Sequence, residues 1–199
     1  MSASARDVRV LAAMARALNR RHGRPALPPL IFVTDPKRTP DIAAAITRQP
    51  PGGAVIYRHF GAADRLAVAR RLRILCHRRR LRLLIGADAV LARLVRADGV
   101  HLPERQRSRA AALRKVHPLW LITVAAHKRA RPVAGADALI LAPVLPSKSA
   151  SAVRPLGARA ANAIAKRANA PVYALGGVNA QNAARLSAFA GFAAVEGLL

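Results

Sequence analysis

The chain has 199 residues, of which 53% are hydrophobic, and 34 basic against 9 acidic side chains give it a formal net charge of +25. This length and apolar content allow one large folded domain or two small ones and exclude a mostly disordered protein. The single cysteine, Cys76, excludes an intramolecular disulfide and a cysteine-rich metal site. No apolar run approaches the roughly 20 residues that span a bilayer, and the N-terminus is too polar for a secretory signal. We therefore expect a cytoplasmic protein that does not bind membranes.

The positive charge has two interpretations. A surplus of this size attracts nucleic acid through the release of counterions. However, the basic residues are scattered along helix-like segments, and aromatic residues, which interleave with them in many single-strand binders, make up only 4% of the chain. Solvent-exposed helix faces are therefore favoured, and nucleic acid is kept as an alternative partner.

The first element in chain order is a helix predicted over residues 4–20. Its apolar residues recur at spacings of three and four, which places them on one face. They are Val8, Leu11, Ala12, Ala15 and Leu18. We assign residues 1–24 to this helix and a linker, and residues 25–199 to a single domain.

Eight short apolar segments follow, and most are separated by stretches with helical spacing. The predicted strands cover residues 30–35, 54–58, 81–86, 98–102, 119–124, 138–143, 171–177 and 192–197. Because they are nearly continuous in apolar residues, both of their faces should be buried, as in a parallel sheet. Eight strands alternating with helices predict an α/β fold of the (β/α)8 TIM-barrel type, with a doubly wound open sheet as the alternative.

Only Leu198 and Leu199 follow the eighth predicted strand, so we expect a barrel with an extra N-terminal helix and no terminal eighth helix. Apolar surface beside the last and first strands then needs a cover, since its exposure costs about 25 cal/mol per Å². We favour the N-terminal helix as that cover, or a second copy of the chain in a homodimer. A helix that covers the barrel floor or lies free is the alternative.

The end of the seventh predicted strand carries a glycine pair, Gly176 and Gly177, ahead of a predicted helix start at Asn179. Glycine lets an anion approach the backbone closely, and a helix N-terminus offers free N–H groups. In a TIM barrel the functional residues lie at this end of the strands. The segment therefore predicts a phosphate site, with a glycine turn that binds nothing as the alternative.

Five strand-end motifs in register resemble the thiamine phosphate synthase/TenI family of TIM barrels. They are FVTD (32–35), ADGVHL (97–102), VAAH (124–127), APVLPSKS (142–149) and ALGGV (174–178). The resemblance runs from about residue 30 to the end of the chain. It implies an enzyme of thiamine biosynthesis that acts on a thiazole phosphate.

The pyrophosphate and magnesium site of the family's synthases is poorly matched. Of its Gln-x-Arg-x-Lys pattern only Arg58 remains, and the positions of its metal-binding carboxylates fall on Ala87 and Gln106. Magnesium prefers carboxylate oxygens, so the resemblance implies no metal and no other cofactor here. Magnesium is expected only if the chain is a synthase with an altered site. Neighbouring Asp88 is better explained as the N-cap of the next helix than as a substitute ligand.

The thiazole half of the site matches better. The resemblance assigns phosphate binding to Gly176 and Gly177 with Asn179, and it assigns thiazole contacts to Ser147 and Ser149.

The resemblance also assigns roles to one arginine and two histidines. His101 matches a strand-end histidine of the synthases and is a candidate for substrate binding, with a structural residue that anchors the loop as the alternative. Arg58 is the candidate cation for an anionic substrate. In the TenI branch, the histidine that matches His127 is implicated in tautomerising a thiazole phosphate carboxylate. Synthases carry a histidine at this place too, and a structural or helix-capping histidine is the alternative. Such a proton transfer needs a group that titrates near neutral pH, as imidazole does.

Three functions remain open from the sequence. A TenI-like thiazole tautomerase is favoured, with His127 and Arg58 as its catalytic residues. A thiamine phosphate synthase with an altered pyrophosphate and metal site is the second. A non-catalytic barrel that binds a phosphorylated ligand or a polyanion is the third.

Overall fold

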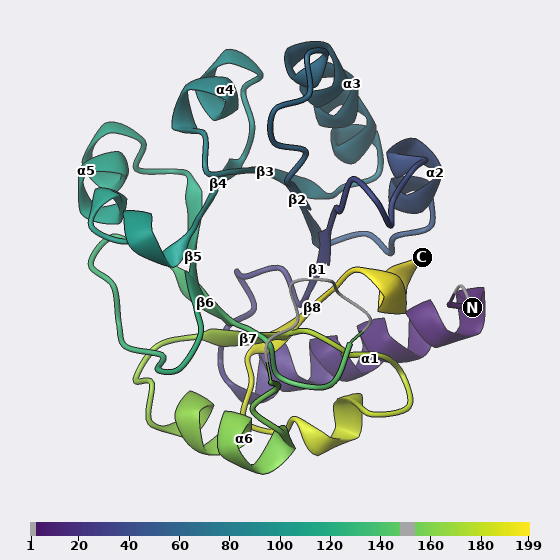
Figure 1. The fold of residues 1–199 in the computed structure, drawn as a ribbon, viewed down its shortest axis with the longest axis vertical. Helices are drawn as coiled ribbons and strands as arrows, with labels where there is room; N and C mark the ends of the chain where they lie inside the picture. Colours follow the sequence, from purple (N-terminus) through teal and green to yellow (C-terminus); the bar gives the residue numbers. More distant parts are fainter. Residues whose placement is uncertain (1–2, 148–153) are drawn as a thin grey trace.

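The computed structural model describes residues 3–147 and 154–199 and confirms the predicted barrel. Eight parallel strands follow one another around a closed ring (Figure 1), and β8 returns to pair with β1. This pairing excludes the open sheet. The strands are β1 (Leu30–Val33), β2 (Ala54–Tyr57), β3 (Arg82–Gly86), β4 (Gly99–Leu102), β5 (Leu121–Ala126), β6 (Ala138–Leu141), β7 (Val172–Leu175) and β8 (Gly191–Ala194).

Helices surround the ring of strands in Figure 1. The α-helices are α1 (Ala5–Arg21), α2 (Ile42–Thr47), α3 (Arg65–Arg78), α4 (Ala89–Leu94), α5 (Arg109–Val116) and α6 (Ala158–Lys166). Among the described residues, the 3-10 helices η1 (Glu104–Gln106), η2 (Ala183–Arg185) and η3 (Glu196–Leu198) follow β4, β7 and β8. Within the described ranges, no helix has the length and apolarity that a membrane span requires.

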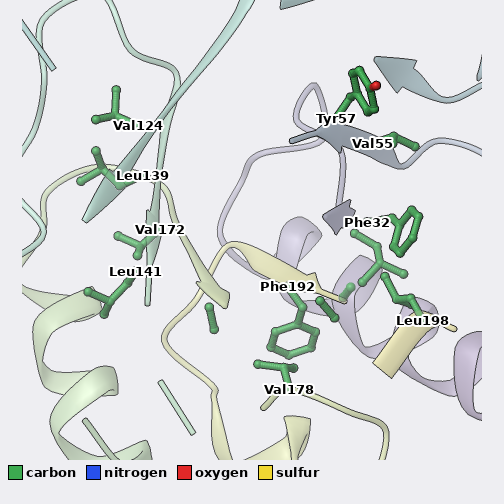
Figure 2. Close-up of a cluster of buried hydrophobic side chains, with 14 of the residues drawn as sticks. Phe32, Val55, Tyr57, Val124, Leu139, Leu141, Val172, Val178, Phe192 and Leu198 are labelled. Carbon is green, nitrogen blue, oxygen red and sulfur yellow. The ribbon is translucent and has the colours of Figure 1, made fainter. Parts of the chain in front are cut away.

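The strands are buried on both faces because their side chains alternate between two cores. One set fills the barrel, with Ile31, Ile56 and Leu84 among its members. The other set lies between the barrel and the helices, and Figure 2 shows part of it around Phe32 and Phe192. This alternation explains the continuous apolar strand sequences, and it fixes which residues beyond the strand ends can point into the barrel mouth.

Helix α1 begins with a capping box, in which the Ser4 side chain accepts the Asp7 N–H and the Asp7 carboxylate accepts the Ser4 N–H. Its apolar face, including Val8, Leu11 and Ala15, is buried in the same core cluster as the outward side chains of the barrel. The helix contacts β8, β1, η2 and η3 and runs beside β8 in Figure 1. This confirms that the N-terminal helix covers the surface beside the last and first strands.

Candidate functional site

The centre of the barrel mouth is formed by polar side chains on neighbouring strands. His101 on β4 pairs in register with Thr123 on β5, and its Nδ1 lies 3.0 Å from the Thr123 hydroxyl oxygen. Burial, together with the positive charge of Arg58, lowers the pKa of His101 to about 3. His101 is therefore a neutral hydrogen-bonding group at physiological pH and not a general acid.

Arg58 directly follows β2 and is held against the end of β1. Its backbone N–H donates to the Thr34 hydroxyl oxygen at 3.0 Å, and its Nε donates to the Thr34 carbonyl at 3.2 Å. Its Nη2 lies 3.8 Å from a carboxylate oxygen of Asp35. Burial lowers the pKa of this guanidinium, which nevertheless stays charged because its ordinary pKa is so high. Since a guanidinium has five N–H donors, these contacts leave donors for an anionic ligand.

A carboxylate network supports Arg58 from the seam between β1 and β8. Asp35 accepts a hydrogen bond from Arg38 Nη2 at 2.9 Å, and this bond is the main cause that lowers the pKa of Asp35. Arg38 also reaches Glu196 in η3, with 3.5 Å between Nη1 and Oε1. Because Asp35 is paired with both Arg38 and Arg58, it neutralises Arg58 only in part. Arg58 therefore remains a positively charged group at the barrel mouth.

His127, which directly follows β5, has a defined tautomer. Its Nδ1 lies 2.8 Å from the carbonyl oxygen of Ala142, which can only accept, so Nδ1 carries the proton in the neutral ring. Its Nε2 lies 3.8 Å from Oε2 of Glu104 in η1. Both side chains are more than a third exposed. Neutral His127 therefore presents a basic nitrogen to solvent or ligand, next to a carboxylate that sequence reasoning missed.

The glycine pair after β7 packs tightly against the loop after β6. Gly176 and Gly177 have φ of +99° and +67°, in the region that favours glycine. A Cβ on Gly177 would lie only 2.2 Å from the Pro146 carbonyl oxygen, and the Leu145 N–H donates to the Gly176 carbonyl. The need for glycine therefore follows from contact between two loops. Outside the strand ladder, the described residues provide no backbone acceptor for the N–H groups of Gly176 and Gly177.

The predicted helix start at Asn179 is wrong. The Asn179 side chain accepts the N–H groups of Gln181 and Asn182 in an Asx turn, and only the short η2 follows. The Asn182 side chain completes this turn by donating to the Gly177 carbonyl at 2.7 Å and accepting the Asn179 N–H. Asn179 therefore shapes the glycine loop, and no helix N-terminus at this point offers free donors to a phosphate.

The loop after β6 connects the glycine pair with His127, since it bonds to both. Ser147 lies in this loop, half-buried, just after the Leu145–Pro146 segment that contacts Gly177. Ser149 lies outside the described residues. His127, Ser147 and the glycine pair thus share one side of the barrel mouth. Arg58 follows β2, on the far side of the ring (Figure 1). His101 lies on β4, between β2 and β5 in the order of strands.

The residues at the family's magnesium position do not fit a metal ion. Asp88 is confirmed as an N-cap, because it accepts the Leu91 N–H at 2.9 Å, and it is paired with Arg65 at 2.6 Å. Ala87 offers no ligand, and Gln106 offers only an amide. Among residues 3–147 and 154–199 no group of three or more histidine, cysteine or acidic side chains could hold a metal.

Known proteins resemble this chain over most of its length. The family model described as thiamine monophosphate synthase matches residues 30–198. A thiamine-phosphate synthase of Alcanivorax borkumensis is 34% identical over 184 residues, which cover 85% of this chain and 80% of that protein. The thiamine biosynthesis bifunctional protein ThiED of Geobacter sulfurreducens is 31% identical over 163 residues, which cover 78% of this chain and 32% of that protein.

A solved structure of thiamine phosphate pyrophosphorylase from Pyrococcus furiosus superimposes with a TM-score of 0.67 at 22% identity, covering 83% of this chain and 84% of that one. This likeness supports the barrel fold. Some curated relatives extend beyond the match, which spans only 61% of a relative from Aquifex aeolicus. With 169 consecutive residues inside the family model, the chain belongs to the thiamine monophosphate synthase family, also called the thiamine phosphate synthase/TenI family.

Proposed function

We propose that this protein is a TenI-like tautomerase that isomerises a thiazole phosphate carboxylate to its aromatic form. The observation that carries the proposal is the geometry of His127, whose Nδ1–H is held by the Ala142 carbonyl while Nε2 stays basic and exposed. An imidazole in this state accepts a proton from one ring position and returns it to another, so the reaction needs no second substrate.

Each remaining side chain of the mouth has a role in this reaction. Glu104, 3.8 Å from Nε2, stabilises the imidazolium that forms after the proton is taken up. The N–H groups of Gly176 and Gly177 bind the phosphate, and Arg58 binds the carboxylate across the mouth. Neutral His101 donates or accepts a hydrogen bond without competing for the proton. Ser147 and Ser149 orient the thiazole ring.

The poor fit of the magnesium position supports a reaction that proceeds without metal. A synthase of this family uses magnesium with a pyrophosphate, and here Asp88 is already engaged by Arg65 and by the start of α4.

The second candidate is a thiamine-phosphate synthase, which the names of the relatives favour. It requires that Arg58, assisted by other basic side chains, replaces the lost pyrophosphate contacts. The third, a barrel that binds phosphorylated ligands without catalysis, rests on the net charge of +25.

Turnover of thiazole phosphate carboxylate, followed by ultraviolet absorbance in EDTA, tests the proposal. We expect metal-independent turnover that falls by about 100-fold or more in His127→Gln, with substrate affinity largely retained. His77→Gln, a change at an exposed position on α3, is the matched control and should be fully active. Coupling to the pyrimidine pyrophosphate only with magnesium would instead establish the synthase. Binding without turnover in either assay would establish the non-catalytic barrel.

A further inference from the structure

A cleft lies at the end of the barrel opposite the mouth, where the strands begin. It has a volume of about 380 Å³ and is bounded by the C-terminal half of α1, by residues 25–29 before β1, and by Pro51 and Gly52 before β2. Pockets for small molecules span roughly 300–1,000 Å³. This floor cleft is therefore large enough for a small ligand, and it is separate from the mouth that holds His127.

Three arginines give the floor cleft a positive charge. Arg16 and Arg20 are one turn apart on α1, so they lie on the same side of that helix, and Arg82 begins β3. All three are exposed, and the described residues that line the cleft include no acidic side chain. None of the three forms an ion pair with a carboxylate of the described residues.

The acidic residues nearest to this end of the barrel are already neutralised. Asp98 and Asp137 precede β4 and β6, and they pair with Arg73 and Arg114. Each also accepts a backbone N–H, from Leu83 and from Ile122 respectively. Asp98 and Asp137 therefore do not cancel the positive electrostatic potential of the three cleft arginines.

The walls of the cleft are fixed by buried hydrogen bonds. Asn19 is only 4% exposed, and its side-chain nitrogen lies 3.3 Å from the Leu27 carbonyl oxygen and 3.4 Å from that of Ala190. The Tyr173 hydroxyl, inside the barrel, donates to the Pro28 carbonyl at 2.7 Å. These bonds join α1, the segment before β1, strand β7 and the residue that precedes β8. The cleft is thus preformed, which reduces the entropy that a ligand must lose on binding.

The chemistry of the lining defines the ligand. Four prolines line the cleft and have no N–H group, so the guanidinium groups are its main donors to an anion. Guanidinium binds phosphate oxygens in a bidentate manner. No aromatic ring lines the cleft to stack a base, as surfaces for single-stranded nucleic acid usually provide. We propose that the floor cleft binds a small, phosphate-rich anion through Arg16, Arg20 and Arg82.

Calorimetric titration with inorganic triphosphate at about 150 mM salt tests this site in the full chain. Arg82→Gln and the double variant Arg16→Gln/Arg20→Gln should each weaken binding about tenfold or more, because each removes a charge-assisted contact. Arg70→Gln/Arg71→Gln on α3 removes two exposed charges elsewhere and is the matched control, expected to change binding less than about twofold.

Two results would overturn the proposal. Equal losses in the control and the cleft variants would mean that triphosphate responds only to net charge. Loss of binding in Arg58→Gln, with no loss in the cleft variants, would place the anion at the mouth. A single-stranded RNA of about 12 nucleotides serves as the competing ligand. If it binds more tightly than triphosphate and depends on the same three arginines, the floor is a polynucleotide surface and the small-anion assignment is wrong.

Discussion

Replacing Leu11 by alanine tests whether α1 is an integral part of the barrel. Leu11 is fully buried and lies in the core cluster that joins α1 to the outer face of the strands. Removing three buried carbons costs about 2.4 kcal/mol at roughly 0.8 kcal/mol per methylene. A remaining cavity of roughly 50 Å³ adds about 1.2 kcal/mol. We therefore expect the free energy of unfolding to fall by about 3.6 kcal/mol.

Urea unfolding followed by circular dichroism measures this loss as a lower midpoint at an unchanged slope. In a thermal scan the same loss lowers the melting temperature by about 7–14 °C for a chain of this size. Val10→Ala on the same helix is the control, because Val10 is 40% exposed, and its effect should stay within about 0.5 kcal/mol. Equally small losses in both variants would refute the packing of α1 on the barrel.

Three further predictions concern single residues. Gly177→Ala should weaken phosphate-ester binding and lower the melting temperature together, because its Cβ would meet the Pro146 carbonyl at 2.2 Å with φ at +67°; unchanged calorimetric affinity would remove Gly177 from the phosphate site. His101, with a pKa of about 3 in the folded state against an ordinary value of about 6.5, contributes stability that is complete above pH 6.5 and is lost as the pH falls toward 3. This stabilisation falls by about 1.4 kcal/mol per pH unit over that range. The unfolding free energy of His101→Gln should therefore decline less steeply between pH 6.5 and pH 4 than that of the wild type. Parallel pH profiles would contradict this. Burial raises the pKa of the Cys76 thiol to about 12, so Ellman's reagent at pH 8 should modify it only after urea unfolds the chain, whereas rapid labelling of the folded protein would show that α3 opens.

The barrel could be predicted from the sequence because its signal is local. Each of the eight strands is a short run of apolar residues, and helical stretches separate most of them, so errors at strand ends did not change the fold. The stripe of α1 was equally visible, since Val8, Leu11 and Ala15 repeat at helical spacing. The assignment of Asp88 as an N-cap also followed from its position ahead of an apolar helix.

Contacts between distant segments could not be predicted in the same way. Glu104 and His127 meet only because the loops after β4 and β5 are adjacent in the ring. The reason for glycine at position 177 lies in the Pro146 carbonyl, about thirty residues earlier in the chain. The helix predicted to start at Asn179 is absent for a local reason that the glycine pair and the apolar spacing do not reveal. Asparagine side chains at 179 and 182 take up the backbone groups that a helix would need.

The packing of α1 beside β8 has a consequence for synthesis on the ribosome. The hydrogen bond between Asn19 and Ala190 joins residues 171 positions apart, so α1 leaves the exit tunnel long before its partner strand exists. At about 5–20 residues per second the delay is roughly 9–34 s. During that time the apolar face of α1 and the unpaired edge of β1 are both exposed, and only the arrival of β8 covers them together. We therefore expect chaperones that shield apolar helices and open strand edges to bind the nascent chain until translation reaches the last strand.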